Sequence, residues 1–419
     1  MSESRLHVLM VADVSPLQSS GGSARVLREQ TIGLRARGHG VSVLCRHPGG
    51  DVPARAELAG APVVHYPVKR TTAFAYARTS VLGARKLFRR LLREQTWDAV
   101  LFHQPFSAVG VQSQIARRVR RIYCFYSPAG VEYRLRAENP QTGRTPPGTN
   151  AVAGLMAWLE RRALAGCHQV VVLSNFSRRV LEEAHGRAAG EVKVIPGGVD
   201  LEHFRPAADR IGVRRTLGLP AEIPLLLTVR DLEPRMGVHN LLRALAVIEK
   251  DRPLFCVIGG TGPLRPFLED QAARLGVSGR VRFTGHIPEE KLPRYYQAAD
   301  LFVLPTRAHE GFGLVTVEAL ACGTPVAATP VGATPEILDP LDSRLLASDA
   351  TVEGLTRNLI RTLPLAMDPN FRHRCRSYVE GRYSWHRHLD ILEKQLRAGL
   401  KNSDAESALS ATGPDVSKA

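Results

Sequence analysis

The sequence lacks the features that place a protein in a membrane or in an oxidising compartment. No apolar run reaches the ~18 residues that a membrane-spanning helix requires. The first residues, MSESRLHVLMVAD, hold no basic segment followed by a hydrophobic stretch and a cleavage site. The cysteines stand at positions 45, 124, 167, 256, 322 and 375 without C-x-x-C spacing, so buried free thiols are expected rather than disulfides or zinc ligands. We therefore expect a cytoplasmic protein.

Acidic residues are scarce in the first half of the chain. The net charge is +16 over 419 residues, of which +14 falls in residues 1–200 and +2 in residues 201–419. The densest basic stretch, residues 78–93, interleaves its cations with apolar residues at helical spacing, and a second basic cluster spans residues 117–121. Two interpretations stay open: peripheral contact with an anionic membrane at its inner face, or a helix packed on its own domain with solvated arginines. Nucleic acid is not an expected partner, because no aromatic platform or groove-reading helix accompanies the charge.

Apolar strands alternate with helical patterns along the chain, which predicts an α/β fold. Residues 6–14 read as a buried strand, followed by a loop with Gly21 and Gly22, a helix over 24–37 and a strand over 41–45. This loop is a poor dinucleotide fingerprint, because it is not G-x-G-x-x-G and no acidic residue follows the second strand, so a hydride-transfer cofactor is disfavoured. At 419 residues the chain can bury two cores.

The stretch over residues 138–150 is rich in proline, glycine, threonine and asparagine, so a loop is expected there. A helix is expected to follow over residues 155–165. A later buried strand, residues 300–306, leads into a loop and then a helix that should begin near Leu314.

Two glutamates flank that loop and helix. Glu310 stands at the mouth of the helix and Glu318 a little over two turns further on, roughly on the same face. A ligand can approach bare backbone at the glycines and meet the free N–H groups that open the helix, which favours an anion. A buried carboxylate needs partners, and sugar hydroxyls are suitable donors. The residues expected at this site are Glu310, Gly311, Phe312, Gly313, Leu314 and Glu318.

The stretch EGFGLVTVEALACGTPV, residues 310–326, resembles the E-x7-E signature of retaining, nucleotide-sugar-dependent glycosyltransferases of the glycosyltransferase family 4 type. The resemblance covers nearly the whole chain, from Leu6 to about Leu400. It implies the GT-B fold, in which two Rossmann-like parallel-sheet domains face each other across a cleft. We expect an acceptor-side domain over 1–205, a nucleotide-sugar-binding domain over 206–380, a helix over 381–400 that crosses back to the first domain, and a disordered tail over 401–419.

In the first domain the resemblance implies roles for five residues. Gly21 and Gly22 would turn their backbone amides to the donor diphosphate or the acceptor. His103 follows the strand at residues 98–102 and would approach the donor sugar and its phosphate. Tyr126 and Glu132 stand where family members often shape the acceptor pocket.

In the second domain the family places an Arg and then a Lys to neutralise the donor diphosphate, usually as GR-x-x-x-x-KG. This sequence departs from that form, because Val229 precedes Arg230 and the expected Lys is either Arg235 or Met236. Alignment on Gly237 favours Met236, whereas the preserved separation favours Arg235. Because a diphosphate between two domains needs cations and a guanidinium binds phosphate in bidentate geometry, we predict Arg230 and Arg235.

Further resemblances complete the predicted donor site. A strand near 254–259 ends in Gly259, Gly260 and Gly262, a loop that could lie under the nucleotide. After the next strand, the family meets the nucleobase through backbone atoms, which points to His286 and Ile287. Glu336, in the V-G-x-x-E pattern after the signature helix, is expected to be structural.

The predicted function is retaining transfer of a sugar from a nucleoside diphosphate to an unidentified acceptor hydroxyl. Glu310 would hold sugar hydroxyls and Glu318 the ribose or the sugar. No metal is expected, because a D-x-D metal motif is absent, and no cofactor is expected. Two alternatives stay open: a non-catalytic nucleotide-sugar-binding protein of the same fold, and another GT-B enzyme such as a phosphorylase or a sugar-nucleotide epimerase.

Overall fold

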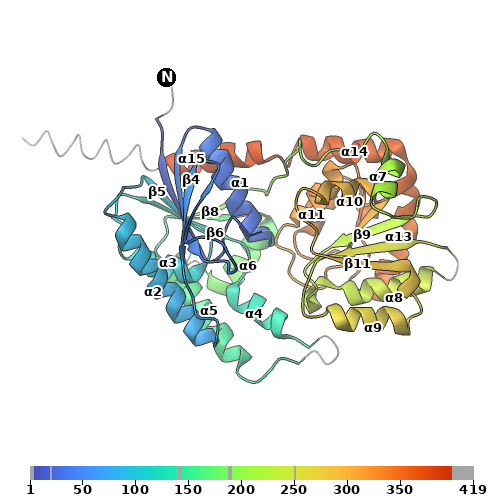
Figure 1. Ribbon diagram of the computed structural model, residues 1–419, viewed down its shortest axis with the longest axis horizontal. Helices are drawn as coiled ribbons and strands as arrows, with labels where there is room; N and C mark the ends of the chain where they lie inside the picture. Colours follow the sequence, from blue (N-terminus) through green and yellow to red (C-terminus); the bar gives the residue numbers. More distant parts are fainter. Residues whose placement is uncertain (1–3, 19–20, 140–143, 187–190, 250–251, 399–419) are drawn as a thin grey trace, which may run out of the picture.

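The computed structural model describes residues 4–18, 21–139, 144–186, 191–249 and 252–398. Figure 1 shows two α/β halves side by side, with the earlier part of the chain in one and most of the later part in the other. Each half is built around its own sheet. The tail predicted for residues 401–419 and the last two residues of the helix predicted over 381–400 lie outside the described residues.

The sheet of the first half has the strand order β3-β4-β2-β1-β5-β6-β7-β8. Its strands are β1 His7–Ala12, β2 Gly40–Arg46, β3 Arg55–Leu58, β4 Ala61–Tyr66, β5 Ala99–Phe102, β6 Arg120–Phe125, β7 Gln169–Val172 and β8 Glu191–Val194. All residues of β5 and β7 are buried, as expected for central parallel strands covered on both faces by helices. The strands from β4 to β8 in this order pair in parallel, as the sequence predicted.

The edge strand β3 departs from the predicted parallel arrangement. It pairs antiparallel with β4. Ala59 and Gly60 join the two strands, and both have positive φ, 49° and 76°. A connection this short can join only antiparallel neighbours, because parallel strands need a long crossover. One edge of the first sheet is therefore a hairpin.

The sheet of the second half is parallel throughout, with the order β11-β10-β9-β12-β13. Its strands are β9 Leu225–Val229, β10 Phe255–Gly259, β11 Val281–Gly285, β12 Leu301–Leu304 and β13 Val326–Ala328. The loops that leave the carboxyl ends of β9, β10 and β12 carry most of the predicted donor-site residues. In open α/β sheets, ligands bind outside these strand ends.

Helices cover both faces of the first sheet. They are α1 Gly22–Ala36, α2 Ala73–Leu91, α3 Pro105–Gln112, α4 Ala129–Ala137, α5 Thr149–Leu164 and α6 Asn175–His185. The sequence did not predict α4. The predicted loop over 138–150 is wrong at its end, because α5 begins at Thr149, directly after Gly148 in a left-handed conformation (φ 82°). Residues 140–143 of that stretch lie outside the described part of the chain.

The second half holds the remaining helices except one. They are α7 Arg210–Thr216, η2 Pro234–Met236, α8 Val238–Ile248, α9 Arg265–Arg274, η3 Ser278–Arg280, α10 Leu292–Ala298, α11 Leu314–Ala321, α12 Thr334–Leu338, η4 Ser343–Leu345, α13 Val352–Met367 and α14 Pro369–Glu380. Across the described ranges, no helix has both the length and the apolar character needed to cross a lipid bilayer.

Helix α15, Trp385–Arg397, returns from the second half to the first (Figure 1). The Ser384 side chain caps it by accepting a hydrogen bond from the backbone of Arg387, so it begins later than the predicted residue 381. Trp385 packs in the core of the second half, whereas Leu389 and the two later leucines of α15 pack in the core of the first. Val199, where the chain leaves the first half, pairs with Ser384, so the two crossings lie side by side.

Candidate functional site

A pocket of about 340 Å³ lies between the two halves. The first half contributes the start of α1, the end of β6 and α4, and the second contributes the loops after β9, β10 and β12 and the start of α11. Of the residues predicted from the sequence, the lining includes Gly21, Gly22, Tyr126, Glu132, Arg230, Arg235, Gly260, His286, Ile287, Glu310, Gly311, Phe312, Gly313, Leu314 and Glu318. Most of the predicted site therefore converges in one place.

The loop between β12 and α11 brings Glu310 to the pocket. Helix α11 begins at Leu314, as predicted, and the preceding Gly313 adopts a left-handed conformation (φ 88°) that glycine takes without strain. Gly311 lies against the first half, where an added Cβ would stand 2.8 Å from the carbonyl oxygen of Tyr126. The Gly311 carbonyl accepts hydrogen bonds from Ser174 Oγ at 2.6 Å and Ser177 Oγ at 3.0 Å. These contacts hold the loop, which belongs to the second half, against the first half.

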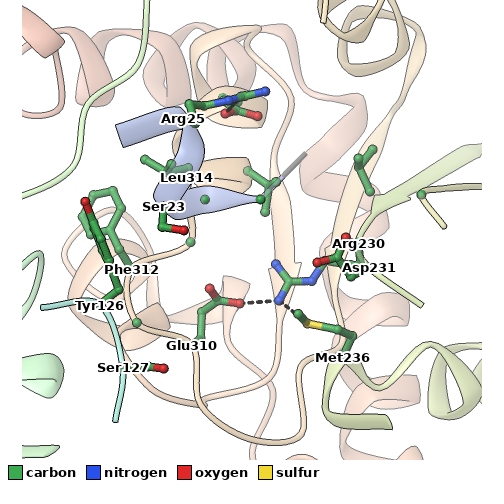
Figure 2. A pocket seen from close by; sticks show the side chains of 18 of the residues that line it. Ser23, Arg25, Tyr126, Ser127, Arg230, Asp231, Met236, Glu310, Phe312 and Leu314 are labelled. Atoms are coloured by element: carbon green, nitrogen blue, oxygen red, sulfur yellow. Dashed lines mark hydrogen bonds and ion pairs between the residues drawn. The ribbon is translucent and has the colours of Figure 1, made fainter. Parts of the chain in front are cut away.

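Glu310 forms a nearly buried ion pair with Arg230, which directly follows β9. Arg230 Nη2 donates to Glu310 Oε2 at 2.5 Å, and the two side chains are 7% and 11% exposed. The same nitrogen lies 2.8 Å from the sulfur of Met236 (Figure 2). It also lies 3.2 Å from Thr306 Oγ1. Arg230 therefore points into the pocket, with its charge balanced by the first glutamate of the motif.

Arg235 also lines the pocket, and it belongs to a charged cluster that bridges the two halves. Its guanidinium donates to the His309 carbonyl at 2.9 Å and lies 3.5 Å from Glu132 and 3.6 Å from Glu233. Arg136 of α4 pairs with the same two carboxylates at 2.8 and 3.4 Å. Burial alone would raise the pKa of Glu132, but Arg136 and Arg235 outweigh it and hold that pKa below its ordinary value. Charges of opposite sign thus alternate where α4 of the first half meets η2 of the second.

Glu318, the second glutamate, is paired from the opposite half. Arg25 of α1 donates to its Oε1, and the hydroxyl of Tyr296 donates to its Oε2 at 3.0 Å. Burial alone would lower the pKa of Arg25, but Glu318 and Glu289 raise it above its ordinary value. Burial and Glu318 raise the pKa of Tyr296 well above its ordinary value, so this hydroxyl stays protonated and donates. Glu318 is therefore a buried carboxylate with two partners.

His103 does not line the pocket, although it is a described residue. It is 1% exposed, and its Nδ1 lies 2.7 Å from the hydroxyl of Tyr126, which does line the pocket. Burial lowers the pKa of His103 to about 3, helped by His388, so its imidazole is neutral. The sequence placed it correctly after a strand that ends at the cleft, but Tyr126 stands in front of it. Its contact with a donor stays a prediction.

The glycine loop after β10 contributes less than predicted. Gly260 lines the pocket together with Thr261, whereas Gly259 and Gly262 do not. A Cβ on Gly259 would stand 2.6 Å from the side chain of Ile287, and one on Gly262 would meet the backbone of Leu232. These two glycines therefore serve close packing behind the pocket wall. In the described part of the chain, no three His, Cys, Asp or Glu side chains gather as a metal-ligand set.

Glu336 joins the two halves beside the pocket. Its carboxylate accepts hydrogen bonds from the backbone nitrogens of Phe176 at 2.6 Å and Asn175 at 2.9 Å, at the start of α6. A carboxylate in this position satisfies free N–H groups and opposes the positive end of the helix dipole. This matches the structural role expected for Glu336.

Sequence reasoning missed several residues of the site because their partners are distant in the chain. One local feature of the sequence indicated a partner for Arg25. It is a cation in the first turn of a helix, where the dipole disfavours positive charge unless a carboxylate lies nearby. Ser174 and Ser177 carried a weaker one, as the cap and first turn of α6. Tyr296, in the short helix α10, carried none.

The fold and the pocket together define a class of protein. Two α/β domains with mainly parallel sheets face each other across a pocket, whose lining includes two carboxylates eight positions apart and the two predicted arginines, Arg230 and Arg235. This is the architecture of a GT-B glycosyltransferase.

Comparison with known proteins identifies the family. Residues 20–203 match the model of "Glycosyltransferase Family 4", and residues 209–382 match that of "Glycosyl transferases group 1". A D-inositol 3-phosphate glycosyltransferase of Saccharomonospora viridis is 30% identical over 418 residues, covering 93% of this chain and 92% of the relative. The chain therefore belongs to the family 4 glycosyltransferases.

Solved structures share the fold at low sequence identity. Sucrose-phosphate synthase from Thermosynechococcus elongatus superposes with a TM-score of 0.77 at 23% identity, covering 97% of this chain and all of that one. Anabaena HepE, crystallised with UDP-glucose, superposes with a TM-score of 0.71 at 21% identity, covering 93% of this chain and 99% of that one. These likenesses confirm the GT-B fold predicted from the sequence.

Proposed function

We propose that this glycosyltransferase takes its sugar from a nucleoside-diphosphate sugar and transfers it to an acceptor hydroxyl with retention of anomeric configuration. The observation that carries the proposal is the convergence of Glu310, Glu318, Arg230 and Arg235 in one pocket between the domains. Cations and carboxylates around one pocket fit a ligand with a charged diphosphate at its centre and hydroxyl groups at both ends. Anabaena HepE, whose fold is similar, was crystallised with such a ligand, UDP-glucose.

The second domain would hold the donor. Arg230 and Arg235 would neutralise the diphosphate, since guanidinium groups bind phosphate oxygens in bidentate geometry. The free N–H groups at the start of α11, opened by Gly313, would add to the positive field. Donor binding then exchanges partners: Arg230 turns from Glu310 to phosphate, and the released Glu310 carboxylate accepts sugar hydroxyls.

The first domain would present the acceptor at Tyr126 and Glu132, which line the same pocket. The acceptor oxygen bonds to the anomeric carbon on the face that the diphosphate leaves. The bond from that carbon to the phosphate oxygen breaks with its electron pair on the phosphate, and the acceptor proton passes to a phosphate oxygen. Positive groups that are already in place stabilise the negative charge as it develops on the leaving diphosphate.

The acceptor is proposed to be an anionic molecule. The first 200 residues carry +14 of the total +16 charge. The Saccharomonospora viridis relative is named for D-inositol 3-phosphate, a phosphorylated compound. Inositol and inositol 3-phosphate therefore make a matched pair in an acceptor screen, because they differ only in the phosphate.

A mass-spectrometric screen tests the donor and the reaction. UDP-, GDP- and ADP-sugars are incubated with the protein and each acceptor, and free nucleoside diphosphate and glycosylated product are measured. The expected result is a product that forms with one donor and keeps the anomeric configuration of that donor by NMR. Phosphate-dependent release of sugar phosphate would instead indicate a phosphorylase, and nucleotide binding without turnover would indicate a non-catalytic binder.

We also propose that helices α2 and α5 place the protein on an anionic membrane at its inner face. Both helices lie in one layer with α3. Phe74 of α2 and Trp158 of α5 are 69% and 60% exposed, and Leu82 of α2 and its C-cap residue Leu92 are also exposed. The same stretches of chain carry exposed cations: Arg78, Arg85, Lys86, Arg89, Arg90, Arg93, Arg161 and Arg162. Helices that expose both aromatic side chains and cations fit the boundary of an anionic bilayer.

Sedimentation with vesicles tests this contact. The protein should sediment with phosphatidylcholine vesicles that contain phosphatidylglycerol and stay in solution with pure phosphatidylcholine. Each substitution Arg85→Ser or Arg89→Ser should weaken binding by about 1 kcal/mol. The control Arg274→Ser removes an exposed arginine of the second domain and should change nothing. Equal binding to both vesicles would contradict the proposal.

A further inference from the structure

Through Arg25, the first domain contacts Glu318, one of the two motif carboxylates of the second domain. Its guanidinium pairs with Glu318 and, at 3.6 Å, with Glu289. Figure 2 shows Arg25 at one end of the pocket and the pair of Arg230 and Glu310 at the other. Each glutamate of the motif is therefore matched by an arginine, but the arginine of Glu318 comes from across the cleft.

The surroundings of this pair make either partner unfavourable alone. The side chain of Arg25 is 18% exposed and that of Glu318 is 2% exposed. A buried carboxylate that loses its cation is strongly destabilised. A cation in the first turn of a helix is opposed by the helix dipole. Arg25 and Glu318 thus hold each other in place across the domain boundary.

Glu318 lines the pocket and can still accept hydrogen bonds from a ligand. Its Oε1 accepts from Arg25 and its Oε2 from Tyr296. A carboxylate offers about four lone-pair positions, so about two remain. A pair of ribose hydroxyls can therefore bind Glu318 while both protein partners stay in place.

We propose that Arg25 is a positioning residue for the donor nucleoside: from the opposite domain it orients the Glu318 carboxylate, so that nucleotide binding draws on both domains. This inference rests on the proposed function, in which Glu318 receives hydroxyls of the donor. It assigns to the first domain, otherwise the acceptor side, a part in donor binding.

The charges around Glu318 leave Arg25 as its direct counter-ion. The titratable and charged groups near it are Arg25 of α1, Glu289 before α10, Tyr296 of α10, Cys322 at the end of α11 and Arg376 of α14. Arg376 donates to the backbone carbonyl of residue 321 rather than to the carboxylate.

Calorimetric titration with UDP, GDP and ADP tests the inference on the full chain. The wild type should bind one of the three nucleotides. Arg25→Ala should weaken that binding roughly 30-fold, since truncating one partner of a buried charge pair has an effect of this order. Arg25→Lys, which keeps the charge, should restore most of the affinity.

A double-mutant cycle separates positioning from folding. In a Glu318→Gln background, Arg25→Ala should change the affinity little, because the carboxylate it serves is gone. Arg35→Ala, on the same helix but outside the pocket lining, is the matched control and should bind as the wild type does. An Arg25→Ala variant with wild-type affinity would overturn the inference. A wild type that binds none of the three nucleotides would overturn the proposed function, and the inference with it.

Discussion

Replacing Glu310 by Gln separates the two tasks that the pocket is expected to perform, sugar transfer and nucleotide binding. The substitution keeps the shape of the side chain and removes its charge. In the structure Glu310 accepts a hydrogen bond from Arg230 at 2.5 Å and lies 3.3 Å from Thr306 Oγ1. Gln can still accept from Arg230 through its amide oxygen, so the pocket should keep its form.

The size of the effect follows from these contacts. Exchanging a charged for a neutral hydrogen bond at this nearly buried site should cost about 1–2 kcal/mol of unfolding free energy. Transfer should fall by about 100–1,000-fold in kcat, because a group already in place at the transferred sugar is lost. Nucleoside diphosphate should bind at least as tightly as before, since Arg230 no longer has a carboxylate to leave. Arg230→Ala should do the reverse and weaken nucleotide binding.

Three measurements on each variant check this split: turnover with the active donor, nucleotide affinity by calorimetry, and thermal unfolding. Glu222→Gln, an exposed site in the same domain, is the control for the chemical change itself. Turnover by the Glu310→Gln protein within about threefold of the wild type would refute the role of Glu310. A large loss of nucleotide affinity would refute the exchange of partners at Arg230.

Other predictions test the contacts around the pocket. Gly311→Ala should lower stability by about 1–3 kcal/mol and weaken nucleotide binding, because its Cβ would crowd the Tyr126 carbonyl; unchanged melting would contradict the contact. Glu336→Gln should lower stability by about 1–2 kcal/mol while leaving the kinetics of transfer nearly unchanged, since it weakens only the cap on α6. Burial, with Glu289 and Asp200, raises the pKa of Glu29 from 4.5 to about 7. Between pH 4.5 and about 7 the Glu29 carboxyl is protonated in the folded state but ionised in the unfolded state, so the free energy of unfolding should fall as pH rises through this window. Glu29→Gln should therefore raise the melting temperature more at pH 8 than at pH 5, and an equal gain at both would count against the shift.

The parts of the site that depend on local pattern could be predicted from the sequence. An apolar strand, a loop with two glycines and the start of α11 occupy consecutive residues, so Glu310 and Gly313 were placed by chain connectivity alone. Arg230 and Arg235 follow the end of β9 for the same reason. Parallel strands buried on both faces indicated the fold class through their continuous apolar runs.

The parts that depend on contacts between distant residues could not be predicted. Arg25 meets Glu318 only because α1 and α11 face each other across the cleft, and neither segment alone indicates that the two helices are close in space. His103 follows a strand that ends at the cleft, yet the side chain of Tyr126, from the end of the neighbouring strand β6, covers it. The glycines after β10 look alike in sequence, but only Gly260 reaches the pocket.

A crystal structure of the protein with an unreactive analogue of its nucleotide sugar tests the central claim most directly. We expect the diphosphate between Arg230 and Arg235, the sugar hydroxyls on Glu310 and the ribose on Glu318, with Arg25 still paired. A nucleotide bound outside the pocket between the domains, or a diphosphate without contact to either arginine, would contradict the claim.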